Sequence, residues 1–179
     1  MKSKIVISLS FVTIILATFI FAQSSEQKYE QQVSCGEERN GLVLCAETKK
    51  KIYKIGDSIS IHVFLKNNSK KTVEILRSNK EYTYNLKNEE GKLIDFSSSF
   101  KNNPLRAFVT RRGVEVAPKE TISKEVILNE YFDLQSKGNY SFVAERLITS
   151  ENLKDKIKIA SGTIKITIQD KQTKHNSNL

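Results

Sequence analysis

The stretch NEYFDLQSKGNYSFVAER, residues 129–146, decides the fold of this chain. It combines aromatic side chains with an Asp and a Lys-Gly pair, in a chain that has no tryptophan. Lys137 and Gly138 are a turn signal, because glycine adopts backbone conformations that other residues avoid. Asp133 begins a corner before this turn, and Tyr140 begins a strand after it. The stretch therefore predicts a corner between two strands, which is a folding feature and not an active site.

Alternating apolar and polar residues extend this prediction along the chain. In SISIHVFLK, residues 58–66, one side of the segment is apolar and the other carries Ser, His and Lys. A period of two residues is typical of a strand that is buried on one face. Phe64 interrupts the polar side, which indicates an edge contact or a second packed surface. The residues predicted to face inward are Ile59, Ile61, Val63 and Leu65.

Other segments show the same strand pattern and are separated by turns. The predicted strands include residues 72–78, 81–88, 105–110, 120–128 and 161–169, while Arg-Arg-Gly at 111–113 is read as a turn and 97–104 as a loop. No segment after the N-terminal apolar run has a convincing helical period, beyond one turn near 129–136. Short strands at regular spacing predict an all-β protein, an antiparallel sandwich of about seven to nine strands.

Four pieces of the sequence, taken together, resemble exported bacterial immunoglobulin-like β-sandwich domains. They are KKIYKIGDSISIHVFLKNNSKKTVEILRS, EYTYNLKNEEGKLI, VEVAPKETISKEVILNEYFDLQSKGNYSF and SGTIKITI. The resemblance spans residues 42–168, and the order and spacing of the pieces carry it. Pro118-Lys119-Glu120 stands where such domains have a Pro-Gly-Glu turn. The resemblance implies an immunoglobulin-like β-sandwich.

The same resemblance gives the opening stretch a role. Asp133, Gly138 and Tyr140 are similar to the tyrosine corner of these sandwiches, where the hydroxyl bonds to backbone a few residues upstream. In antibody domains the second cysteine follows that tyrosine by two residues. Here the position is Phe142, so an apolar contact is expected in place of the disulfide between the sheets.

A weaker resemblance is to the bacterial intracellular proteinase inhibitor family, whose members are also β-sandwiches. It rests on the run from KNNSKKTVEI to NEEGKLI. It implies a loop that is presented to a protease, and the pair Arg111 and Arg112, between two predicted strands, is the tentative binding loop. A charged turn without a binding role is the alternative interpretation.

The N-terminus has the layout of a secretory signal peptide. Residues 1–22 carry Lys2 and Lys4, then an apolar run that ends at Ala22. This run is also just long enough for an uncleaved membrane anchor. The sequence predicts a signal peptide at 1–22, a flexible lead-in at 23–34, one domain at 35–169 and a disordered tail at 170–179. Without the anchor, no membrane span is expected in the mature chain, which would be secreted, periplasmic or in the cell envelope.

Cys35 and Cys45, the two cysteines of the chain, lie in the part predicted to be exported. In an oxidising compartment, an even pair this close is expected to form a disulfide. The spacing lacks the C-x-x-C pattern of a redox dithiol, and no histidine stands at metal-ligand spacing. The sequence therefore predicts a structural disulfide that fixes the first part of the domain.

The formal net charge of +9, to which Lys2 and Lys4 contribute, favours anionic partners such as an envelope component or an acidic protein. The lysines are scattered, however, and short clusters also serve to keep loops and strand ends soluble. Aromatic and basic residues are not interleaved in the way that binds nucleic acid, so no specific nucleic acid is expected.

Catalytic and cofactor motifs are missing from the sequence. His62 lies on the polar side of a predicted strand and His175 lies in the tail, so no Ser-His-Asp or Cys-His arrangement is apparent. No metal, calcium or phosphate motif is present, and no cofactor is expected. The sequence predicts a non-enzymatic binding module that uses loops or an edge strand, with protease inhibition as the alternative function.

Overall fold

The computed structural model describes residues 30–78, 81–103, 111–148 and 156–171. The predicted signal peptide, most of the lead-in, the strand at 105–110 and most of the tail lie outside these residues. Eleven strands and two short helices make up the described part, so the protein is all-β, as predicted. No helix within the described ranges is long and apolar enough to cross a membrane.

The first sheet contains four antiparallel strands in the order β1-β2-β4-β8. Their bounds are β1 (Gln32–Cys35), β2 (Leu42–Thr48), β4 (Ser60–Asn67) and β8 (Thr121–Ile127). The inward residues predicted for β4 are confirmed, since Ile59, Ile61, Val63 and Leu65 are all buried. The lead-in prediction needs a correction, because residues 32–34 are already part of β1, which pairs with β2.

The second sheet is built around β9 (Gly138–Ile148). One edge of β9 pairs with β6 (Tyr82–Asn88), and the other edge pairs first with β11 (Ile164–Gln169) and then with β10 (Ile157–Ala160). The outer edge of β11 pairs with the short strand β3 (Ile52–Lys54) in the parallel sense. The sheet is therefore mixed, which corrects the prediction of purely antiparallel pairing.

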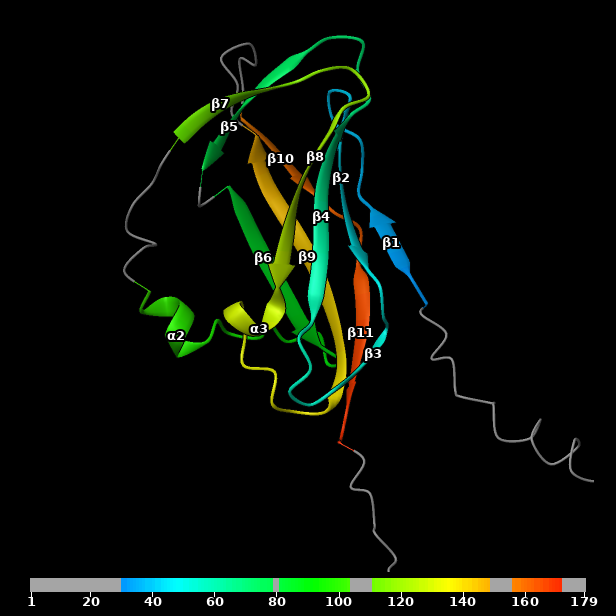
Figure 1. Ribbon diagram of the computed structural model, residues 1–179, viewed down its shortest axis with the longest axis vertical. Coiled ribbons are helices and arrows are strands. Elements are labelled where there is room, and N and C mark those ends of the chain that lie inside the picture. Colours follow the sequence, from blue (N-terminus) through cyan, green and yellow to red (C-terminus); the bar gives the residue numbers. More distant parts are fainter. Residues whose placement is uncertain (1–29, 79–80, 104–110, 149–155, 172–179) are drawn as a thin grey trace, which may run out of the picture.

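A two-stranded sheet formed by β5 (Val73–Ser78) and β7 (Arg111–Val116) lies at one end of the molecule (Figure 1). The short helices α2 (Ser98–Lys101) and α3 (Leu128–Tyr131) lie toward the other end. Two local predictions are wrong here. Residues 111–113 are in a strand and not a turn. The predicted loop at 97–104 contains α2, and the Phe100 amide of this helix donates to the Ser97 hydroxyl.

Buried side chains from the two larger sheets form one hydrophobic core, and the sheets face each other across it (Figure 1). The first sheet contributes Leu44 and Ile61, and the second contributes Phe142 and Ile166. Every second residue along each strand contributes to this core, because successive side chains point to opposite faces of a sheet. The residues at the alternate positions form the two outer faces of the sheets. The candidate site lies on these outer faces.

The turn between β7 and β8 contains Lys119, at the position where the sequence resemblance leads one to expect Gly. Lys119 has φ +68°, and the Glu120 amide donates to the Ala117 carbonyl at 3.0 Å. Pro at the second position and a positive φ at the third are the signature of a type II turn. Lys119 therefore occupies a left-handed position that favours glycine.

Replacing Lys119 with Gly is expected to raise the free energy of unfolding by about 0.5–1 kcal/mol, measured by urea denaturation. The left-handed region costs an L-residue about 1–2 kcal/mol, and part of this gain is lost because Gly makes the unfolded chain more flexible. Lys119→Ala is the matched control, because it removes the charge and keeps the strained φ. Equal stabilisation by both substitutions would show that charge is the cause.

Candidate interaction surface

The outer face of the first sheet carries charged side chains in one row across three strands. The register places Glu47 of β2 beside His62 of β4, and His62 beside Glu125 of β8. The Gln31 amide donates to the Glu47 carboxylate at 2.7 Å, and the Ser60 hydroxyl donates to the Glu125 carboxylate at 2.5 Å. We call Glu47, His62 and Glu125 the acidic row.

The next row on the same face is largely apolar. Cys35, Cys45, Phe64 and Ser123 are cross-strand neighbours, and the Phe64 ring contacts the His62 ring at a centroid distance of 5.7 Å. Val33 and Val43 flank this row on β1 and β2, and Val33 is 50% exposed. We call Val33, Val43, Phe64 and the two cysteines the apolar strip. In the row that follows Phe64, Lys66 lies between Val43 and Thr121.

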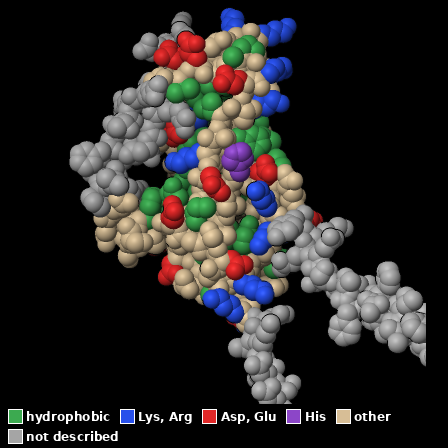
Figure 2. Space-filling model, in the orientation of Figure 1, with side chains coloured by type: hydrophobic (Ala, Val, Ile, Leu, Met, Phe, Trp, Pro, Cys, Tyr) green, Lys and Arg blue, Asp and Glu red, His purple; other side chains and the backbone are tan. Residues whose placement is uncertain are grey.

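Figure 2 looks onto this face and shows apolar side chains beside a histidine, with acidic and basic side chains around them. A groove of about 590 Å³ borders the acidic row; its lining includes Glu47, Lys49, Tyr53, His62, Ser123 and Glu125. Burial raises the pKa of Tyr53, and its hydroxyl lies 2.7 Å from the Thr48 hydroxyl. The groove is open to solvent and lined by both apolar surface and charged side chains, which suits a segment of another protein better than an enclosed small molecule.

The outer face of the second sheet has a different character. Its outward positions on β9, β10 and β11 are mostly polar, namely Asn139, Ser141, Glu145, Lys158, Lys165 and Thr167, with Val143 and Leu147 as the apolar members. Side chains here pair with each other, as Lys158 does with Glu145 at 3.0 Å. The first sheet therefore carries the more apolar of the two outer faces.

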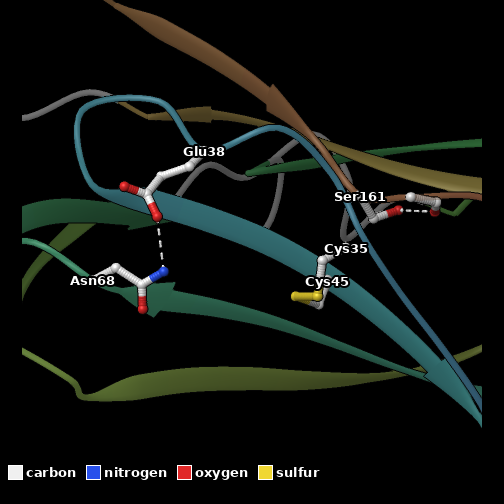
Figure 3. The surroundings of a disulfide bond; sticks show 6 residues. Cys35, Glu38, Cys45, Asn68 and Ser161 are labelled. Atoms are coloured by element: carbon white, nitrogen blue, oxygen red, sulfur yellow. Dashed lines mark hydrogen bonds between the residues drawn. A yellow bond between two sulfur atoms is a disulfide. The ribbon is translucent and has the colours of Figure 1, made fainter.

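Cys35 and Cys45 form a disulfide between β1 and β2, across neighbouring positions of the ladder (Figure 3). The same segment packs closely on the second sheet, since a Cβ added to Gly162 would lie 2.1 Å from the Ser34 hydroxyl oxygen. A hydrogen bond of 2.9 Å from Asn68 to Glu38 ties the β1–β2 connection to the loop after β4 (Figure 3). The disulfide thus fixes β1 and with it one border of the apolar strip.

Replacing both Cys35 and Cys45 with Ser is expected to lower the free energy of unfolding by about 2–3 kcal/mol, because the bond closes a short loop in the unfolded chain. Urea denaturation of the variant and of the natural chain would measure the difference. Treating the natural chain with a reductant is the control, and it should shift the midpoint toward that of the variant. An unchanged midpoint in both experiments would contradict a stabilising role.

The corner residues of the opening stretch lie at the start of β9. The Tyr140 hydroxyl donates to the Ser136 carbonyl at 2.9 Å, Gly138 has φ +152°, and Asp133 is exposed. Burial, and next the Glu89 carboxylate, raise the pKa of Tyr140. None of these groups belongs to the outer face of the first sheet.

Tyr140→Phe is expected to lower the free energy of unfolding by about 1–2 kcal/mol, because it removes one hydrogen bond and leaves the Ser136 carbonyl without that donor. Binding through the first sheet should change little, since the corner lies in the other sheet. Thermal unfolding monitored by circular dichroism would test this. A melting temperature equal to that of the natural chain would count against a structural role for the hydroxyl.

Arg111 and Arg112, the tentative binding loop, are located in a strand. Arg111 pairs with Ser78 and Arg112 with Arg77, so their backbone belongs to the β5–β7 ladder. This corrects the predicted loop. An inhibitor of the predicted kind needs a protruding loop, and β-ladder backbone does not supply one at these two residues.

Several residues of the outer face escaped sequence reasoning. Phe64 was marked as unusual, but Val33, Glu47 and Glu125 carried no local signal. Their proximity depends on which strands are neighbours and in which register, and the alternation of one strand does not encode that. Among the described residues, no three His, Cys, Asp or Glu side chains form a group that could hold a metal ion.

The fold and this surface define an all-β domain with two facing sheets and a partly apolar outer face. Residues 48–169 match the family model described as flagellar collar protein C, N-terminal domain. The match covers more than half of the chain, and the chain belongs to this family. This family has a different name from the two families that the sequence resembles. No curated protein matches the chain.

Proposed function

We propose that this protein is an exported, non-enzymatic assembly component of the flagellar collar in the cell envelope. The family match over residues 48–169 carries this proposal, because it spans all strands from β3 to β11. Assembly proteins act through surfaces, and the apolar strip beside the acidic row is a surface of the kind that a protein partner covers. Residues 35–169 form the assembling domain, and the corner at Tyr140 supports a relationship to immunoglobulin-like sandwiches.

The location can be tested in flagellated cells of the source organism. A C-terminally tagged chain is expected to concentrate at flagellar bases, and deletion of the gene is expected to remove density from the collar in electron cryotomograms. A uniform distribution in the envelope, together with an unchanged collar in the deletion strain, would contradict the proposal.

Export through residues 1–22 is a separate part of the proposal and has its own test. N-terminal sequencing of the chain recovered from the envelope is expected to begin just after Ala22 when the signal is cleaved. A sequence that begins at Met1 would instead favour an uncleaved anchor, and recovery of the chain in the cytoplasm would contradict export.

A further inference from the structure

The outer face of the first sheet is chemically self-complementary. The acidic row, the row of Cys45, Phe64 and Ser123, and the row of Lys66 follow one another along the same strands. Same-face rows are spaced by two residues, or about 7 Å. The apolar strip thus has two carboxylates on one side and an amine on the other, and Lys66 is exposed. Among the described residues, no ion pair joins Lys66 to a carboxylate.

The geometry points to a second copy of this chain as the occupant of this face, an inference that rests on the proposed function. Consider a two-fold axis that lies in the plane of the interface and runs perpendicular to β4, through the row of Phe64. Rotation about this axis brings Phe64 onto the partner's Phe64. The same rotation sets Lys66 over the partner's His62, so that its amine lies between the carboxylates of Glu47 and Glu125 on the two neighbouring strands. Each contact then occurs twice, as in an isologous dimer.

Charge selects this axis over the other two-fold arrangement of the same faces. An axis parallel to β4 would place Lys66 on the partner's Lys66, and Glu47 on the partner's Glu125. Like charges in contact across an interface cost several kcal/mol, so that arrangement is disfavoured. The perpendicular axis instead brings each Lys66 amine between two carboxylates of the partner and places no carboxylate on a carboxylate. Glu47 and Glu125 also retain their bonds from Gln31 and Ser60.

Charge reversal tests this interface. The full chain is expressed in bacteria with a C-terminal tag, and its dimerisation is measured by sedimentation over a range of concentrations. Mild detergent is added if the N-terminal segment is not cleaved and anchors the chain in the membrane. Lys66→Glu alone, and Glu47→Lys with Glu125→Lys, are each expected to weaken dimerisation at least about tenfold. A mixture of the two variants is expected to restore dimers, because each variant then meets the opposite charge. Lys165→Glu, on the outer face of the second sheet, is the matched control and should leave dimerisation unchanged.

Circular dichroism and thiol titration verify that each variant is folded and disulfide-bonded. Dimers that form again when the two variants are mixed support the interface. A natural chain that stays monomeric at millimolar concentration overturns it, and so does a mixture that stays monomeric. These results are independent of the location at the flagellum. A chain that reaches the collar without self-association would retain the proposed function and disprove this interface, and a dimer found away from flagella would do the reverse.

Discussion

Replacing Glu81 with Gln is expected to lower the free energy of unfolding by about 3–5 kcal/mol, the largest effect that we expect from a single substitution. The Glu81 carboxylate accepts a hydrogen bond of 2.9 Å from the Arg146 guanidinium, and their side chains are 5% and 1% exposed. Arg146 also donates to the Tyr82 hydroxyl at 2.9 Å and lies 4.9 Å from the centre of its ring. Without the Glu81 charge, the buried guanidinium loses its counter-ion and cannot recover water.

Chemical denaturation of three variants separates this cause from a general packing defect. Glu81→Gln leaves a buried charge, whereas Glu81→Leu with Arg146→Met removes both charges and should recover most of the stability. Asp170→Asn is the control, because it breaks the exposed Lys137–Asp170 pair and should change stability by less than about 1 kcal/mol. A double variant as unstable as Glu81→Gln would show that packing, and not the unpaired charge, is responsible.

Asn67→Ala is expected to lower the free energy of unfolding by about 3 kcal/mol, because three backbone groups, of which the Val116 carbonyl is buried, would lose their partner. The Asn67 side chain is fully buried, and its amide donates to the carbonyls of Lys71 and Val116, each at 2.8 Å. Its carbonyl oxygen accepts from the Ser69 amide at 2.9 Å and from the Ser69 hydroxyl at 2.7 Å. One side chain thus holds the loop after β4 against the end of β7.

The neighbouring residue supplies the control for this experiment. Asn68 makes one side-chain bond, to the exposed Glu38, so Asn68→Ala should cost less than about 1 kcal/mol in the same denaturation assay. The Lys119 amide donates to the main-chain carbonyl of Asn67. In the Asn67→Ala variant, this amide should exchange its hydrogen faster. Equal stability of the two variants would contradict a central role for Asn67.

Sequence patterns predicted the local features that depend on residues close together in the chain. The period of two residues identified the buried side of β4, and it identified a strand at 161–169, where Ile164, Ile166 and Ile168 are buried. Strands of four residues, such as β1 and β10, are too short to show a period and were missed. The helix α2 was missed for the same reason, since it has only four residues.

Sheet pairing could not be predicted in this way. Residues 111–113 look like a turn because of their charges and their glycine, yet they pair with β5 across more than thirty intervening residues. The parallel pairing of β3 with β11 likewise joins segments from opposite ends of the domain. Such pairing is determined by how the whole core closes, and the local pattern is compatible with several partners.

Local sequence patterns are sufficient to show that this protein is built from strands and which side of β4 faces the core. They also show that its two cysteines are close enough in the chain to bond. The tertiary structure alone decided which polar residues are buried, as Asn67 and Arg146 are, and which side chains share a face, as Glu47, His62 and Glu125 do. The difference comes from how far apart in the chain the interacting residues are. Alternation and turn formation are set by adjacent residues, whereas burial of a polar group and neighbourhood across strands depend on partners that are distant in the chain.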